Sequence, residues 1–406
     1  MLSLRTVHAS RLTNRVLSAA SVSSALSVSP VSLASPASPA LRSQAALLTT
    51  VPRHTLRCYS TSPETTSKMA ARRPQRTPAI PAPSASVVVI SPDNEVLLLH
   101  RVQTAGSFSS AHVFPGGNLS RFHEGELVPF VDSPARHVDG EAYRLAAIRE
   151  TFEESGVLLA KRADGTESHS LLQLHPDDIS RGRLAVANEQ VRFEEWLGEV
   201  GGVPDLENLI PFTRWLTPPN LARRYTTQMY LYMMPLADHD SPPPYVPTAD
   251  NTEVMAAEFA PAAEWVDRAQ RNEVILFPPQ MYLLSLLAPF LASTPGPVDQ
   301  ETLSTERRRL AELVRDGRAP DEDARTFVPW ADRVISPQMA GRIHTADGQD
   351  RTVMVLDSPG PELRGKRGGD SYRTIVLSNM PPGPPRDIEV RRRSEVLPLL
   401  REKEKL

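Results

Sequence analysis

"IRETFEESGV", residues 148–157, places one arginine and three glutamates within six positions: Arg149, Glu150, Glu153 and Glu154. Like charges spaced three or four residues apart on a helix repel one another. The arrangement therefore carries a cost unless a positive charge lies among the carboxylates.

The flanking residues predict a helix that begins just after Asp139 and ends at Gly156. Asp139 is a good N-cap, and Glu141 places a carboxylate in the first turn. Gly156 supplies a left-handed C-cap. Apolar residues at helical spacing form the buried stripe of this helix: Leu145, Ile148 and Phe152. The three glutamates then share another face, and Arg149 lies between the two faces.

The residues before this helix favour a metal site over the alternative, an ordinary solvated acidic surface. The strand-like "AHVF", residues 111–114, runs into Pro115, Gly116 and Gly117, and paired glycines let the backbone approach a ligand closely. Carboxylate and backbone carbonyl oxygens together make an all-oxygen cage, which suits Mg²⁺ or Mn²⁺. A bound cation would turn the repulsion among the glutamates into coordination.

Residues 149–157 resemble the second half of the Nudix box, G-x5-E-x7-R-E-U-x-E-E-x-G-U, in which U is aliphatic. Glu141 stands eight residues before Arg149, as the box requires, and Gly117 would be the opening glycine. Residues 118–140 separate the two where the box has five residues, so the resemblance implies a box split by an insertion. Thr151 replaces the usual aliphatic residue.

The resemblance implies a role for each matching residue. Glu153 and Glu154 would ligate the metal ions, together with the backbone carbonyl of Gly117. Glu150 would ligate or would act as the base toward the attacking water. Arg149 and Glu141 would orient the carboxylates.

Three further residues are candidates outside the box. Glu253, in "NTEVMAAEF", would be the extra carboxylate that many Nudix enzymes bring from a later strand, although Glu258 competes for this role and a surface acid is an equal alternative. Arg223 and Arg224 are candidates for binding substrate phosphates, because adjacent arginines present planar donor forks. Ordinary surface arginines are the alternative for this pair.

Later segments resemble the subgroup of Nudix hydrolases that contains a coenzyme A diphosphatase of peroxisomes and mitochondria. The segments are "RWLTPPNLARRYTTQMYLYMMP" at 214–235 and "ILFPPQMYLLSLL" at 275–287. The resemblance implies an α/β/α sandwich with a mixed β-sheet. It also implies a metal-dependent hydrolase that cleaves the diphosphate of coenzyme A or acyl-coenzyme A. An ADP-ribose or dinucleotide diphosphatase, or an idle nucleotide-binding Nudix module, remains the alternative.

The first 60 residues predict a mitochondrial transit peptide. They hold six arginines and many serines but no Asp or Glu, and "LRCYSTS" at 56–62 resembles a matrix-processing pattern. A disordered tail is the alternative. A start at Met69 would skip this segment and give a cytosolic form, or a peroxisomal one if the terminal residues 404–406 act as a targeting tripeptide.

Without that segment the net charge would move from −3 to about −9, and the single cysteine, Cys58, would be lost. An acidic balance argues against binding to nucleic acid. No apolar run reaches the roughly 18 residues that a membrane span needs. We therefore expect a small-molecule partner, a nucleoside diphosphate derivative.

The composition also predicts the boundaries of the domains. A Pro-rich linker at 61–83 precedes the Nudix domain at 84–295, which carries a helical insertion at 158–211. An amphipathic helix and a small C-terminal β appendage follow at 296–380, with strands expected at 351–360 and 371–377. Residues 381–406 read as a charged tail.

Overall fold

The computed structural model describes residues 78–102, 110–166, 170–236, 246–250, 253–291, 299–318, 322–346, 348–366, 368–378 and 383–400. The predicted transit peptide at 1–60 and most of the predicted linker lie outside the described residues.

A mixed sheet of eight strands forms the centre of the fold. Its order is β10-β7-β8-β1-β2-β3, with β4 paired to β1 and β9 paired to β2. Strand β1 runs parallel to β8 and antiparallel to β2. The bounds are β1 Ala82–Ile90, β2 Val96–Arg101, β3 His112–Val113, β4 Gly116–Asn118, β7 Ile210–Leu216, β8 Tyr225–Met233, β9 Val254–Ala260 and β10 Val334–Ile335.

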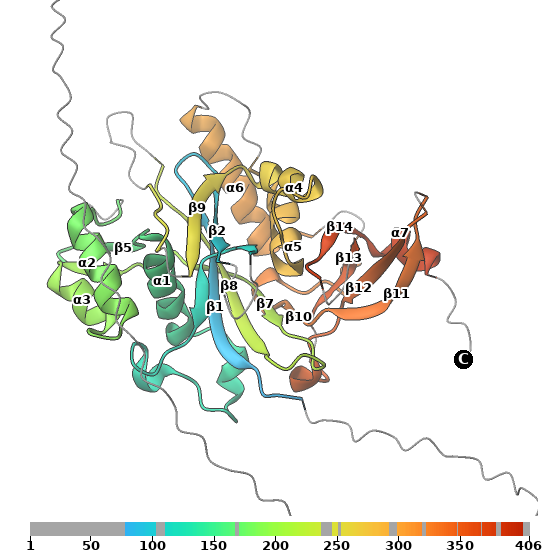
Figure 1. Ribbon diagram of the computed structural model, residues 1–406, viewed down its shortest axis with the longest axis horizontal. Coiled ribbons are helices and arrows are strands. Elements are labelled where there is room, and N and C mark those ends of the chain that lie inside the picture. Colours follow the sequence, from blue (N-terminus) through green and yellow to red (C-terminus); the bar gives the residue numbers. More distant parts are fainter. Residues whose placement is uncertain are drawn as a thin grey trace, which may run out of the picture. The chain divides into compact units, whose positions relative to one another are not determined.

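Helices cover both faces of this sheet (Figure 1). One face packs against α1 Glu141–Ser155, α2 Pro176–Ala187 and α3 Phe193–Glu199. The other packs against α4 Ala262–Gln270, α5 Pro278–Leu287 and α6 Gln300–Asp316. Strand β1 serves both layers, because alternate side chains point to opposite faces: Val87 and Val89 lie in the first core, Val88 and Ile90 in the second. The predicted α/β/α sandwich with a mixed sheet is confirmed.

Helix α1 follows the prediction except at its first residue. Gly156 ends the helix with a left-handed φ of 74°, and the stripe of Leu145, Ile148 and Phe152 is fully buried. The predicted N-cap is wrong, because Gly140 and not Asp139 occupies that position. The Asp139 carboxylate instead accepts hydrogen bonds from Arg144 at 2.6 Å and from Tyr230 at 2.5 Å.

The segments before and after α1 contain short elements. Two turns of 3₁₀ helix, Gly125–Leu127 and Pro134–His137, lie between β4 and α1. The predicted helical insertion at 158–211 holds α2, α3 and a small hairpin of β5 Ala160–Arg162 and β6 Gly202–Pro204. The Phe152 ring of α1 stacks on Trp196 of α3 at 4.5 Å, so the insertion packs directly on the glutamate-bearing helix.

A second, antiparallel sheet forms the C-terminal part. Its order is β11-β12-β13-β14, with bounds β11 Gln338–His344, β12 Asp350–Leu356, β13 Asp370–Ser378 and β14 Arg386–Arg392, followed by α7 Arg393–Val396. The two predicted strands are β12 and β13, whereas β11 and β14 were not predicted. Apolar residues of this sheet join the core beneath α4, α5 and α6: Met354, Leu356, Ile375, Leu377 and Ile388.

Helix α6 ties this C-terminal part to the first hairpin. The Arg307 guanidinium donates to the carbonyl oxygens of Ser91 and Met234, both at 2.5 Å, and to Asn94 Oδ1 at 2.6 Å. Asn94 has a φ of 62° in the turn between β1 and β2. No helix in the described ranges is long and apolar enough to cross a membrane.

Candidate active site

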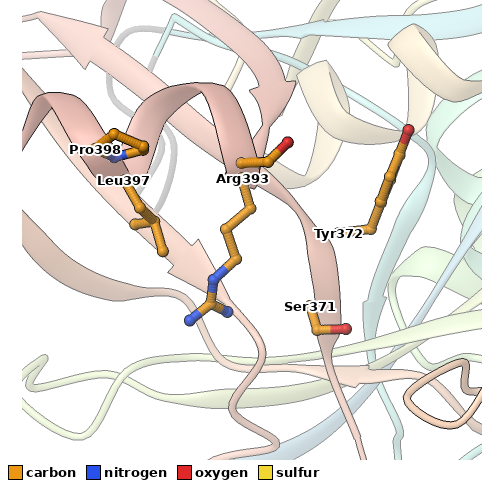
Figure 2. A pocket seen from close by; sticks show the side chains of 6 residues that line it. Ser371, Tyr372, Arg393, Leu397 and Pro398 are labelled. Atoms are coloured by element: carbon orange, nitrogen blue, oxygen red, sulfur yellow. The ribbon is translucent and has the colours of Figure 1, made fainter. Parts of the chain in front are cut away.

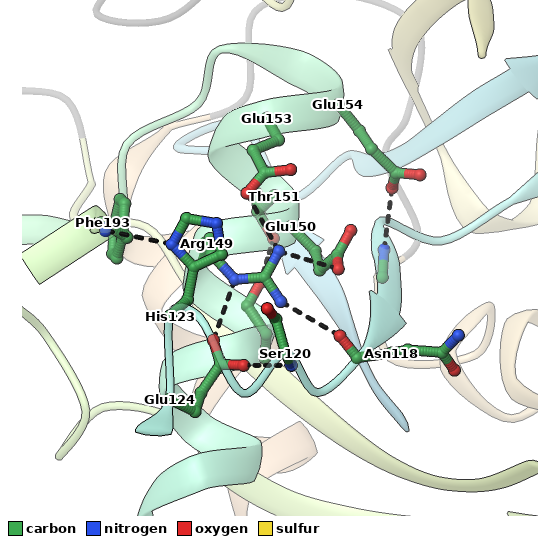
Figure 3. A network of polar contacts seen from close by, with 12 residues as sticks. Asn118, Ser120, His123, Glu124, Arg149, Glu150, Thr151, Glu153, Glu154 and Phe193 are labelled. Carbon is green, nitrogen blue, oxygen red and sulfur yellow. Dashed lines mark hydrogen bonds and ion pairs between the residues drawn. The ribbon is translucent and has the colours of Figure 1, made fainter. Parts of the chain in front are cut away.

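Arg149 lies at the centre of the glutamate cluster (Figure 3). Its Nε donates to Glu124 Oε1 at 2.8 Å, and its Nη1 donates to Glu150 Oε1 and Glu153 Oε1, each at 2.9 Å. Its Nη2 donates to the carbonyl oxygen of Asn118 at 3.0 Å. The planar fork thus fixes the orientation of Glu150 and Glu153 through one oxygen each. Their Oε2 atoms accept no hydrogen bond from the described residues.

The charges of this cluster do not balance. Burial alone would lower the pKa of Arg149, but Glu150, Glu124 and Glu153 together raise it, so this guanidinium stays charged. Burial raises the pKa of Glu153 to about 7, opposed by Arg149 and reinforced by Glu150. One arginine therefore neutralises only part of the negative charge of the carboxylates, and the remaining negative charge favours the binding of a cation.

Glu154 lies on the far side of α1 from Glu124 and is held by different partners. Its Oε2 accepts the backbone N–H of Gly116 at 2.9 Å, and its Oε1 accepts Arg101 Nη1 at 3.3 Å. Arg101 Nη2 reaches Glu253 Oε2 at 2.7 Å. Burial raises the pKa of Glu154 well above its ordinary value, and the charge on Glu150 raises it further.

The two glycines of β4 allow the strand to contact α1. A Cβ at Gly117 would stand 2.4 Å from Glu150 Cδ, inside the carboxylate itself. Gly116 has a φ of 155°, and its Cβ would meet the carbonyl oxygen of Ala85 at 2.4 Å. A side chain at Gly117 would displace the Glu150 carboxylate, and one at Gly116 would force β4 away from β1.

Glu141 does not have the orienting position that the box spacing predicted, and this prediction is corrected. Its side chain is exposed in the first turn of α1 and forms no hydrogen bond or ion pair within the described residues. Glu124 takes the place beside Arg149: its side chain is fully buried, and its second oxygen accepts the N–H of Ser120 at 2.5 Å. Burial raises the pKa of Glu124, and Arg149 opposes that shift.

Glu124 stands seven residues after Gly117, one more than the box spacing, and this near match is the signal that could have found it. The long insertion therefore lies between Glu124 and α1, and not between Gly117 and the first glutamate of the box. Thr151, the other departure from the box, is buried with its hydroxyl bonded to the carbonyl oxygen of Ala147 at 2.7 Å, so α1 accommodates it.

Glu253 and Glu258, the two candidates for the extra carboxylate, differ in their contacts. Glu253 shares Arg101 with Glu154 and so adjoins the cluster. Glu258 pairs with Arg268 of α4 at 3.0 Å. The contacts therefore favour Glu253.

The structure separates the two arginines proposed for substrate phosphates. Arg224 is buried, and its guanidinium donates to Glu362 and to the carbonyl oxygens of Ala79 and Thr217. Its prediction as a phosphate ligand is therefore wrong, because a carboxylate already fills its donor fork. Arg223 is exposed.

The chemistry of the donors fits a hard divalent cation: carboxylate oxygens on one helix beside a glycine turn. Yet within the described part of the chain no group of three or more His, Cys, Asp or Glu side chains is arranged to hold a metal ion. Arg149 binds one oxygen each of Glu150 and Glu153, and Arg101 binds one oxygen each of Glu154 and Glu253. Metal binding would require the carboxylates to move closer together than they stand here.

Two open hollows lie apart from the glutamates. One, of about 400 Å³, is on the C-terminal part, lined by Ser371, Tyr372, Arg393 and Leu397 (Figure 2). The other, of about 420 Å³, is lined by Lys161, Asp205 and Tyr232 among others. Neither is lined by a residue of α1.

Comparisons with known proteins agree with the resemblance seen in the sequence. Residues 132–287 match the family described as the NUDT19 Nudix domain. Acyl-coenzyme A diphosphatase NUDT19 of Gallus gallus is 31% identical over 240 residues, covering 49% of this chain and 62% of that protein. The protein of the same name from Xenopus laevis is 27% identical over 326 residues, covering 71% and 76% of the two chains. The match thus spans less than two thirds of the chicken relative.

Among solved structures, a Nudix hydrolase from Alicyclobacillus acidocaldarius is 25% identical, with a TM-score of 0.41; it covers 53% of this chain and 98% of that chain. From the family match and the named relatives, the chain carries a Nudix hydrolase domain that resembles that of the acyl-coenzyme A diphosphatases.

Proposed function

We propose that this protein hydrolyses the diphosphate of coenzyme A or acyl-coenzyme A, with Mg²⁺ or Mn²⁺ as cofactor. The observation that carries the proposal is the set of glutamates on α1, oriented by a buried arginine, in a domain that resembles the acyl-coenzyme A diphosphatases. An idle binding module would not need to keep all three carboxylates.

Glu153, Glu154, Glu150 and the Gly117 carbonyl would hold the divalent ions, with Glu253 as the additional carboxylate. Such ions neutralise phosphoryl oxygens and acidify water. Glu150 would alternatively accept the proton of the attacking water, because its Oε2 faces no donor among the described residues. Arg149 holds Glu150 in place by its Oε1, so the proposed base keeps one orientation.

The reaction inserts water into the diphosphate bridge. The water oxygen bonds to one phosphorus, and the bond from that phosphorus to the bridging oxygen breaks. The products are 3′,5′-ADP and 4′-phosphopantetheine, or its acylated form, with the thioester uncut.

The insertion at 158–211 supplies a wall for an extended substrate. Arg183 of α2 donates to the carbonyl oxygen of Glu153 at 2.9 Å, so this insertion reaches the C-terminal end of α1 beside the glutamates. A segment that borders the site in this way is a natural selector of the substrate.

The test is product analysis by mass spectrometry in ¹⁸O-water, with purified full-length protein and either Mg²⁺ or Mn²⁺. We expect the label in one phosphate product from coenzyme A and from an acyl-coenzyme A. Free fatty acid with intact coenzyme A would contradict the proposal, and faster turnover of ADP-ribose or a dinucleotide would establish the alternative substrate class. Glu153→Gln protein prepared in parallel controls for contaminating hydrolases.

We also propose that the protein is imported into mitochondria, on the basis of the acid-free, arginine-rich residues 1–60. An internally tagged full-length fusion should colocalise with a mitochondrial marker and be processed near Ser60. Cytosolic fluorescence of that fusion would contradict this proposal.

A further inference from the structure

Glu154 has both carboxylate oxygens occupied, unlike Glu150 and Glu153. One oxygen accepts the Gly116 N–H at 2.9 Å and the other accepts Arg101 at 3.3 Å. A metal ion that used the second oxygen would meet the guanidinium there. Each oxygen keeps a second lone pair, but a cation there would lie beside the Arg101 guanidinium and be repelled by it, so the ion and Arg101 compete for Glu154.

The Gly116 amide cannot be the donor that leaves. Gly116 pairs with Ser86 where β4 joins β1, so the sheet holds the position of its N–H. Arg101 is a flexible side chain, and its Nε–H is buried without a hydrogen-bond partner in the described part of the chain. Its present position is therefore incompletely satisfied.

Glu253 gives Arg101 a second anchor that is easy to release. The Arg101–Glu253 contact is 2.7 Å, but the Glu253 side chain is 61% exposed, so the separated carboxylate would be solvated by water. The contact to the buried Glu154 is the longer one, at 3.3 Å. Arg101 thus spans one buried and one exposed carboxylate that come from different elements of the fold.

We propose that Arg101 is an internal stand-in for a divalent cation: it holds Glu154 and Glu253 together in the metal-free protein and leaves them when the ion binds. Removing its charge should therefore strengthen metal binding. A side chain with a merely structural role would weaken metal binding when removed, so the sign of the change separates the two roles.

The inference rests on the proposed function only for the involvement of a divalent cation. It does not depend on the substrate, so it can fail while coenzyme A hydrolysis holds. It can also hold if the substrate is another diphosphate.

The experiment is a titration of the full-length protein with Mn²⁺ alone at constant pH, with free Mn²⁺ measured by electron paramagnetic resonance. Arg101→Gln should bind Mn²⁺ at least about fivefold more tightly than the unchanged protein, the lower end of typical coupling between sites. Arg101→Lys keeps the charge but lacks the planar fork that places one carboxylate on each Nη, so its affinity should fall between those of Arg101→Gln and the unchanged protein. An unchanged or weaker affinity in Arg101→Gln, with the fold intact by circular dichroism, would overturn the proposal.

Two further variants keep the test decisive. Arg271→Gln removes an exposed arginine that pairs with Glu273 at 2.6 Å, and it should leave Mn²⁺ affinity unchanged. Glu253→Gln should weaken Mn²⁺ binding, because the loss of an acidic ligand outweighs the release of Arg101 from this anchor. If Arg101→Gln does not fold, a Mn²⁺ affinity of Arg101→Lys equal to or below that of the unchanged protein overturns the proposal instead.

Discussion

Arg149, on α1, and Arg101, at the end of β2, each link a glutamate of α1 to a glutamate from another segment: Glu124 for Arg149 and Glu253 for Arg101. Arg149 is 3% exposed and has four acceptors, one of them a main-chain oxygen. Arg101 has two carboxylate acceptors, and a buried Nε–H with no partner among the described residues. Arg149 leaves one oxygen of Glu150 and of Glu153 open, whereas Arg101 closes the last open oxygen of Glu154.

The difference shows that an arginine can either orient the glutamates of a site or compete with a metal ion for them, depending on which carboxylate oxygens it binds. A buried guanidinium held by four acceptors is a permanent part of the scaffold. One that spans a buried and an exposed carboxylate can be exchanged for another cation.

Arg149→Met should produce the largest effect, a loss of both stability and activity, because it removes the arginine that orients the glutamates. Glu124 would be left buried and unpaired, which costs about 3–5 kcal/mol of stability. Activity should be lost as well, because Glu150 and Glu153 lose their common donor. Urea denaturation and coenzyme A hydrolysis measure the two effects. Stability within about 1 kcal/mol of the unchanged protein would show that Glu124 does not depend on Arg149.

Glu150→Gln and Glu153→Gln should each lower kcat by about 100-fold or more, the size seen when a group that stabilises the transition state is removed. Stability without metal should hold or rise, because each change removes one charge from a repelling set. The matched control is Glu141→Gln, on the same helix but exposed, which should keep most of the activity. A Glu141→Gln defect equal to that of Glu153→Gln would restore the role expected from the box spacing.

The smallest expected effect is a dependence of metal-free stability on pH. The pKa of Glu153 is raised by burial from 4.5 to about 7, and that of Glu154 is raised in the same direction. A carboxyl with a raised folded pKa stabilises fully below its unfolded pKa, and this contribution is lost as pH rises through the folded value. The melting temperature in EDTA should therefore fall between about pH 5 and pH 8. Glu153→Gln should flatten the slope, and an equally steep slope in that variant would assign the effect elsewhere.

The predictable features depend on neighbours in sequence. Helical periodicity sets the stripe of Leu145, Ile148 and Phe152, and the left-handed Gly156 sets the end of the helix, so the sequence is enough to place α1 and its glutamate face. The N-cap failed by one residue because Asp139 has two tertiary partners, Arg144 and Tyr230, that compete with capping.

The features that escaped prediction depend on distant residues. Glu124 pairs with an arginine 25 positions later, across an insertion that hides the box spacing. Arg224 pairs with Glu362, 138 positions away in the 3₁₀ helix between β12 and β13, and Arg101 meets Glu253 because β2 and β9 are neighbours. Local patterns contain no information about such pairings.

The Arg307 contacts have a consequence for how the chain unfolds. The stretch that matches the Nudix family ends at residue 287, but α6 clamps the turn between β1 and β2 and shares its core with the C-terminal sheet. The part of the chain that unfolds cooperatively therefore extends beyond the part that matches the family. We expect calorimetry to show one transition for the described part of the chain, and a protein ending near residue 295 to melt far earlier, since its first hairpin would lose the arginine that closes it.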